Sequence, residues 1–264
     1  MASNGFSCVL LLKLTIIPLA VLALGIMERL HGPRVAGWLS GFPVVALPLL
    51  LFITLDHGAA FGSASALGAW YGLVAWLSFA MAYSWCSRVL NWFWCCAIGL
   101  AVWTVMALVM LSAQQVSPWT MLLPVLAFVV ALLAYPRGEA SDEQREHVWW
   151  GLPVRMIAGA VLTVVITQFS NALGSRWSGL FSTFPMIGSV IAVSNHIQYG
   201  PRAVQEAVAG MSMGLASIGA FCFSLYILLN MTGVWTAFGL ALVASSTAHA
   251  LTYLLFKHKD KKAS

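Results

Sequence analysis

Residues 32–43 read Gly32-Pro33-Arg34-Val35-Ala36-Gly37-Trp38-Leu39-Ser40-Gly41-Phe42-Pro43, and residues 174–185 read Gly174-Ser175-Arg176-Trp177-Ser178-Gly179-Leu180-Phe181-Ser182-Thr183-Phe184-Pro185. The second stretch repeats the first at a fixed offset that pairs Gly32 with Gly174, and the register continues without a gap from position 13 to position 87. Only 11 of these 75 positions are identical, but most identities are Gly, Pro, Ser and Arg. These residue types are hard to exchange inside a lipid-buried segment. The pattern therefore indicates a duplicated unit.

The composition places this unit in a membrane. The chain has 264 residues, of which 61% are apolar and 8% charged, and its mean hydropathy is +0.89. A soluble domain carries about 25% charged residues. Several apolar runs reach the ~20 residues that a helix needs to cross a bilayer. The sequence therefore predicts an all-α, polytopic transmembrane helix bundle.

Polar or Gly/Pro breaks divide the apolar sequence into about nine predicted spans. They cover residues 9–29, 36–55, 61–84, 91–112, 118–135, 154–173, 177–197, 204–229 and 234–256. We expect three regions: a first repeat of four helices in residues 1–117, a linking helix with a cytoplasmic loop in residues 118–152, and a second repeat of four helices with a basic tail in residues 153–264.

The distribution of basic residues predicts the orientation, because cytoplasmic loops carry an excess of Lys and Arg. With the N-terminus outside and the C-terminus in the cytoplasm, 11 of the 13 basic residues lie on the cytoplasmic side. Only Lys13 and Arg176 remain on the other side. Equivalent helices of the two copies are five spans apart. Because five is odd, the second copy crosses the membrane in the opposite sense, which predicts an inverted-topology repeat like those of secondary transporters.

The repeated motif combines a cation, small residues and a helix breaker. Arg34, Gly37 and Ser40 share one helical face. At the start of the predicted helix, we expect the Arg to lie near the interface and the Gly to let a neighbouring helix approach. Pro43 and Pro185 follow about 12 Å into the membrane. Each proline frees the carbonyl four residues before it, and the nearby Ser is expected to help satisfy that carbonyl. Pro48 predicts a second interruption in the first copy.

Two interpretations of the motif stay open. In the first, two broken helices approach the midplane from opposite sides and form a shared polar site. Its arginines attract an anion, its serine hydroxyls contact the anion, and its prolines permit rocking. In the second, kinked helices pack through small residues, with arginines that snorkel to the interface. The first interpretation gives the candidate substrate-binding residues Arg34, Ser40, Pro43, Arg176, Ser182 and Pro185.

Lys13, Arg155 and His249 are secondary candidates, because ionisable residues at membrane depth mark functional sites. His249 lies a little past the middle of the last predicted span and is the deepest titratable group. It could relay protons, but a hydrogen bond between helices explains it equally well. The sequence shows no catalytic constellation, no metal-binding spacing among its five cysteines and no cofactor motif. We therefore expect neither an enzyme nor a metal or cofactor site.

The motif resembles that of the GlpM-like inner-membrane proteins of bacteria. The resemblance rests on Lys13, on Gly37-x-x-Ser40-x-Phe42-Pro43 with Gly58, and on residues 178–185 through Tyr199-Gly200. It covers residues 13–112 and 155–256. It implies a multi-pass protein of the bacterial inner membrane. Members of this family look like single units of about four helices, whereas this chain fuses two.

These observations favour a small transporter or flippase-like permease for a small or lipid-linked anion. The alternative is a non-transporting accessory or scaffold protein of an envelope-biogenesis complex. The expected partners are membrane lipids and the anionic substrate, and the candidate protein partners are a second copy of the chain or an envelope complex. Nucleic acid is not expected, because four of the lysines behind the net charge of +5 lie in the last eight residues and form a flank for anionic headgroups.

Overall fold

The computed structural model describes residues 38–112, 117–134 and 174–260, together with isolated positions between 15 and 30 and between 153 and 172. The predictions for Lys13, Arg34 and Arg155 lie outside the described residues. So do most of the predicted spans 9–29 and 154–173. In the described part of the chain, every regular element is a helix and no strand occurs.

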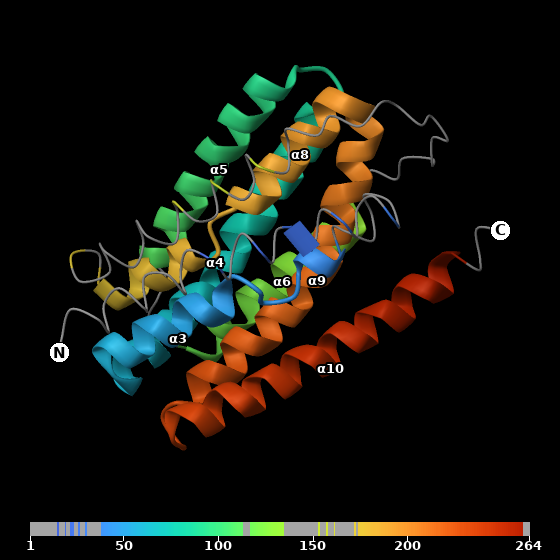
Figure 1. Ribbon diagram of the computed structural model, residues 1–264. Coiled ribbons are helices and arrows are strands. Elements are labelled where there is room, and N and C mark those ends of the chain that lie inside the picture. Colours follow the sequence, from blue (N-terminus) through green and yellow to red (C-terminus); the bar gives the residue numbers. More distant parts are fainter. Residues whose placement is uncertain are drawn as a thin grey trace.

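Five of these helices are long and apolar enough to cross a membrane, as an integral membrane protein requires. They are α4 (Ala59–Cys86), α5 (Trp92–Ser112), the interrupted helix Gly174–Tyr199 that ends in α8 (Met186–Tyr199), α9 (Pro201–Leu228), and α10 (Val234–Asp260). Two further apolar helices are shorter: α3 (Ala46–His57) and α6 (Pro118–Ala134). Figure 1 shows how they are arranged.

The secondary structure repeats in the register of the sequence. The 28-residue helices α4 and α9 begin and end at positions that the repeat pairs with each other. The first residues of α5 and α10 are also paired by the repeat. Gly58 joins α3 to α4 with φ 88° and ψ 169°, and Gly200 joins α8 to α9 with φ 80° and ψ −172°. Such positive φ angles favour glycine, because glycine has no Cβ. The glycines kept between the copies therefore fix the same corner twice.

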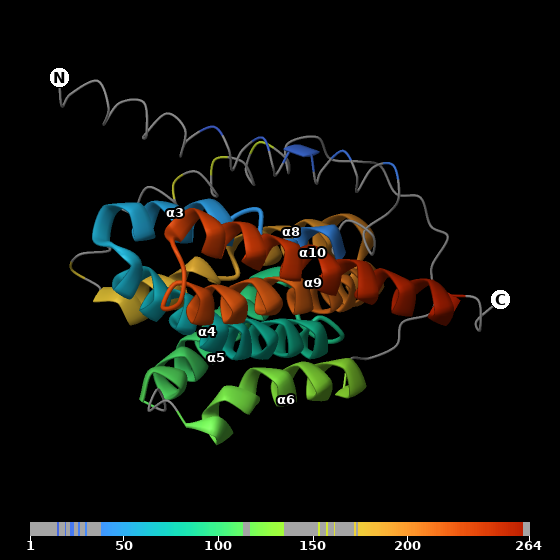
Figure 2. The same cartoon turned by 90° about the horizontal axis from the view of Figure 1, so that it is seen from below.

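The long helices α4 and α9 form the centre of the molecule and run antiparallel. The hydroxyl of Ser63, near the start of α4, donates to the carbonyl of Tyr226, near the end of α9, at 2.9 Å. In the middle of both helices, Gly219 lies against Trp70 and Leu73. The helix α6 packs on one side of this pair, and α3 and α8 lie on the other (Figure 2). The helices α4 and α9, which the sequence repeat pairs with each other, therefore point in opposite directions.

The breaks predicted at the Phe-Pro dipeptides are confirmed, but the first copy differs from prediction in detail. The predicted span 36–55 is helical at residues 38–40, irregular at 41–45, and helical again only in the 12-residue α3. The prediction that Pro48 adds a second interruption is wrong. Pro48 is the third residue of α3, and a proline in the first turn removes no helical hydrogen bond.

Candidate functional site

Two helix breaks lie at the centre of the described structure. We call residues 41–45 the first break and residues 183–185 the second break. Pro43 and Pro185 lack the N–H that a continuing helix would use, and the helix before each of them ends. Each preceding turn closes instead with shorter-range backbone hydrogen bonds, from Gly41 N to Trp38 O (3.1 Å) and Phe42 N to Leu39 O (3.0 Å), and from Thr183 N to Leu180 O (3.2 Å) and Phe184 N to Phe181 O (3.0 Å).

The backbone after each break is also the same. Val44 N donates to Phe42 O at 2.7 Å, and Met186 N donates to Phe184 O at 2.7 Å. The next helix then starts on the proline carbonyl, which accepts from Leu47 N in the first copy (2.9 Å) and from Ser189 N in the second (2.7 Å). Four hydrogen bonds thus recur in the register of the sequence repeat, so the repeated motif encodes one backbone shape.

Each break packs against the long helix of the other copy. In the first break, the backbone of Gly41 lies against that of Gly214 in α9, and a Cβ on either residue would collide with the other. In the second break, Thr183 and the Leu180 carbonyl before it lie against Gly72 in α4. Gly72 and Gly214 are each the fourteenth of the 28 residues of their helices. Both breaks therefore lie at the middle of the helix pair, in reciprocal contacts of the kind that a two-fold axis generates.

The predicted close approach at the motif glycine is confirmed in the second copy. A Cβ on Gly179 would collide with the backbone of Ser65 in α4. Its counterpart Gly37 lies outside the described residues. The second copy's helical residues before the break therefore cross α4 in backbone contact.

The predicted serine contact takes a different form. Ser182 is buried, and its hydroxyl donates to the Gly179 carbonyl at 2.6 Å, not to the Phe181 carbonyl that the proline displaces. The Phe181 carbonyl instead accepts the backbone N–H of Phe184. In this arrangement the Ser182 hydroxyl presents lone pairs, and contact with an anion requires its rotation. Ser40, the counterpart in the first copy, is half-buried.

Pro43 and Pro185 are buried, whereas Arg176 is exposed. The backbone of Arg176 packs on Gly68, the tenth residue of α4. At 1.5 Å per residue, this position is about 7 Å from the midpoint of α4. Arg176 is not paired with a carboxylate in the described part of the chain. The structure therefore places the backbone of Arg176 seven residues before the second break, with no carboxylate partner among the described residues.

His249 lies at the first break, although it belongs to α10 of the second copy. Its ring stacks on Trp38 with centroids 4.0 Å apart and meets Phe42 edge-on at 5.5 Å. The side chain is only 9% exposed, and neither ring nitrogen has a hydrogen-bond partner among the described residues. The structure thus brings together two candidates that the sequence singled out separately, His249 and the Phe42-Pro43 break.

Sequence reasoning missed Trp103, which occupies the corresponding place at the second break. It belongs to α5 of the first copy and meets Phe184 edge-on, with centroids 4.8 Å apart. Its indole N–H is buried and has no acceptor among the described residues. With 12 tryptophans in the chain, nothing in the sequence separates this one from those of an interfacial belt.

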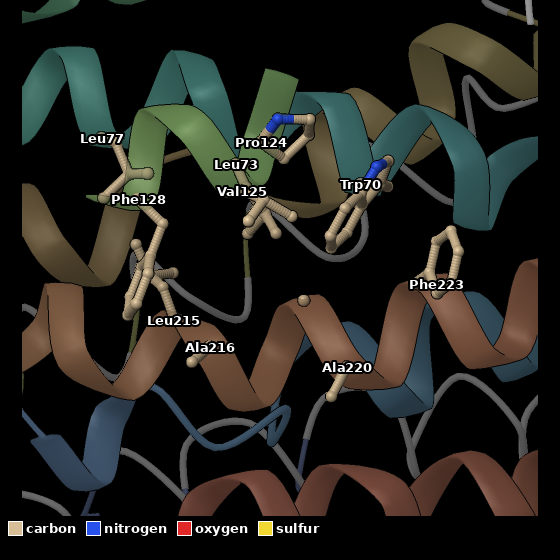
Figure 3. Close-up of a pocket in the computed structure, with 11 residues that line it drawn as sticks. Trp70, Leu73, Leu77, Pro124, Val125, Phe128, Leu215, Ala216, Ala220 and Phe223 are labelled. Atoms are coloured by element: carbon tan, nitrogen blue, oxygen red, sulfur yellow. The ribbon is translucent and has the colours of Figure 1, made fainter. Parts of the chain in front are cut away.

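An apolar groove of about 200 Å³ lies between α4, α6 and α9 (Figure 3). Its lining holds one polar side-chain group, the indole N–H of Trp70, which donates to the Met121 carbonyl at 3.3 Å. On α4, the groove is lined by Trp70, Leu73 and Leu77. Gly68 and Gly72 instead pack against the helical residues that lead into the second break. At 100° per residue these sets lie on different sides of the helix. The groove is therefore separate from the site formed by the breaks.

No family model, curated protein or solved structure matches this chain.

Proposed function

We propose that the chain is a small transporter or flippase-like permease for a small or lipid-linked anion, built from two inverted copies of one unit. The observation that carries this proposal is the reciprocal packing of the two breaks at the midpoints of α4 and α9. In secondary transporters with inverted repeats, discontinuous helices meet near the membrane midplane and form the substrate site there. Two discontinuous helices that meet at the middle of a central helix pair support the same class of function for this chain.

The inverted topology is supported by the antiparallel course of α4 and α9. These helices occupy equivalent places in the two copies. If both helices cross the membrane, the two copies have opposite orientations. The sequence predicts the same, because equivalent helices are five spans apart and five is odd. We propose that the N-terminus is outside, that the C-terminus is cytoplasmic and that the membrane is the bacterial inner membrane. The GlpM-like resemblance and the nine spans stay predictions.

The preference for an anion is supported by the depth of Arg176. A 28-residue helix is about 42 Å long, and the hydrocarbon core is about 30 Å thick. With α4 centred in the bilayer, the backbone of Arg176 lies about 7 Å from the midplane, inside the hydrocarbon. A guanidinium kept at that depth, with no carboxylate beside it among the described residues, is costly unless it lines a polar pathway. We propose that its guanidinium receives the anionic group of the substrate.

Reconstituted vesicles test the proposal with two phosphate probes: inorganic phosphate for a small anion and fluorescent phosphatidylglycerol for a lipid-linked one. We expect faster flux of one probe than in protein-free vesicles, and Arg176→Gln should lower that flux about tenfold or more, because hydrogen bonds to charged groups are worth about 1.5–3 kcal/mol.

Arg88→Gln is the matched control, because Arg88 is an exposed arginine that covers the ring of Trp85 at the end of α4, 4.6 Å from its centroid. Flux that is equal in wild type and Arg176→Gln contradicts the proposed site. If neither probe moves, transport of both substrate classes is contradicted, and the scaffold alternative remains.

A further inference from the structure

The environment of His249 differs from that of a histidine that merely joins two helices. A neutral imidazole carries one donor and one acceptor, and a structural histidine uses at least one of them. Both ring nitrogens of His249 are buried, and neither has a partner among the described residues. Burying such groups without hydrogen bonds is costly. Within the described residues, both ring nitrogens are therefore available to a ligand, and the smallest ligand for an imidazole nitrogen is a proton.

The surrounding rings suit the protonated form. The imidazole lies over the face of Trp38, with an interplanar angle of 19°. A cation over an indole face is attracted by the negative charge density of the ring, and the attraction grows when water is excluded. Trp38 is held in place by Thr252, whose hydroxyl accepts from its indole N–H at 3.1 Å and donates to the His249 carbonyl at 2.8 Å. The indole is therefore preorganised for an imidazolium.

The described elements around His249 bring no carboxylate next to it. Neither the first break nor Trp38 carries a titratable side chain. On α10, the ring of Tyr253 packs against that of Trp38, with centroids 5.4 Å apart. On α9 the Ser217–Ser245 hydrogen bond places Met213 level with His249. The nearest carboxylate of α9, Glu206, is seven residues further, or about 10 Å. Lys257 lies two turns along α10, and its side chain is outside the described set. Among the described residues, no ion pair therefore holds a proton on His249, and the proton can dissociate.

Among the described residues, the second break has no equivalent group. The position that matches His249 in the first copy is Ala107, and the ring at the second break is the indole of Trp103, which does not titrate. A proton therefore changes the charge at one break only. Because His249 belongs to the second copy and Trp38 to the first, its charge also changes the attraction between the copies.

We propose that His249 binds a proton at the first break and that this proton is the coupling ion of transport. The coupling rests on the proposed function, whereas the proton site itself does not. Protonation strengthens the contact of the first break with α10, and deprotonation weakens it. The two copies then rock between a state in which the first break is held against α10 and a state in which it is released from α10.

Fluorescence of the full-length protein in lipid nanodiscs tests the proton site. The signal of wild type minus that of Trp38→Phe isolates Trp38, whose emission falls when a positive charge lies over its ring. We expect a titration within the range of about pH 5 to 8 in which imidazoles change charge. It should disappear in His249→Gln and persist in His196→Gln, where the altered ring lies beside Tyr83 instead. A flat difference signal, or one that persists in His249→Gln, overturns the proposal.

A second measurement tests the coupling. In vesicles that carry flux of either phosphate probe, a pH gradient should raise the flux of wild type and of His196→Gln. In His249→Gln the ratio of flux with and without the gradient should fall to one. A ratio of one in wild type overturns the coupling. If neither probe moves, the proposed function fails, and the fluorescence titration decides separately whether the proton site exists.

Discussion

The first break and the second break share their backbone and differ in what covers them. Both follow a helical turn that ends at Phe-Pro, with the same four hydrogen bonds, and both lie against the central glycine of the other copy's long helix. The first break is covered by a titratable imidazole and touches α9 through Gly41, whereas the second is covered by an indole and touches α4 through Thr183. The repeated motif thus goes with one backbone shape, and the helix that packs across each break decides which ring lies against it.

The largest expected effect concerns the opposite orientation of the copies. Val89 and Met231 are equivalent positions of the repeat, at the turns that follow α4 and α9, and both are exposed (84% and 75%). A membrane-impermeant maleimide should label Val89→Cys only from the cytoplasmic side and Met231→Cys only from the opposite side. The parent protein, with its five native cysteines, provides the background. Labelling of both positions from one side contradicts the inverted repeat.

The next effect compares the glycines that receive the breaks. The three atoms nearest to a Cβ at Gly214 are backbone atoms of Trp38 and Gly41, which cannot move aside, so Gly214→Ala should lower the free energy of unfolding by about 3 kcal/mol. Gly239→Ala in α10 is the control, because its Cβ points into open space. Chemical unfolding in detergent measures both. An equal effect of the two substitutions would show that Gly214 is not in close contact.

The second break should tolerate the same change better. A Cβ at Gly72 collides with the Thr183 hydroxyl, and the backbone is further away, at 3.2 Å to the Leu180 carbonyl. We expect Gly72→Ala to cost about 1–2 kcal/mol. Thr183→Ala in the same chain should recover part of that cost, which a double-mutant cycle measures. The absence of any coupling between the two substitutions would place the contact elsewhere.

The smallest effect concerns how the covering helix is attached. Ser217 and Ser245 join α9 to α10 through buried hydroxyls 2.8 Å apart, whereas the equivalent positions in the first copy are Ala75 and Trp103. Ser245→Ala should cost about 1 kcal/mol, the usual net value of a hydrogen bond. Ser246→Ala is the control, because this exposed hydroxyl bonds only to its own helix. Equal melting temperatures for the two variants would argue against this attachment.

Sequence patterns predicted the elements well where the reason was local. The apolar runs predicted α4, α5, α6, α9 and α10 to within a few residues at most ends, because length and hydropathy determine such helices. Pro43 and Pro185 located the breaks, since a proline removes a backbone hydrogen bond and kinks or interrupts a helix, although α6 continues through Pro124. The serine contact at Ser182 was predicted less well, because a hydroxyl can choose between several nearby carbonyls and the choice depends on the turn geometry.

The sequence by itself indicated the repeat and located the helix interruptions at Pro43 and Pro185, because a proline removes a backbone hydrogen bond whatever its tertiary surroundings. Only the tertiary structure decided which residues meet at those places. His249 is far from Phe42 along the chain, and Trp103 is far from Phe184; neither pair belongs to a repeat match, and both come together because α10 and α5 pack across the breaks of the other copy. Side-chain contacts between such distant parts of the chain depend on helix packing, which no local pattern records.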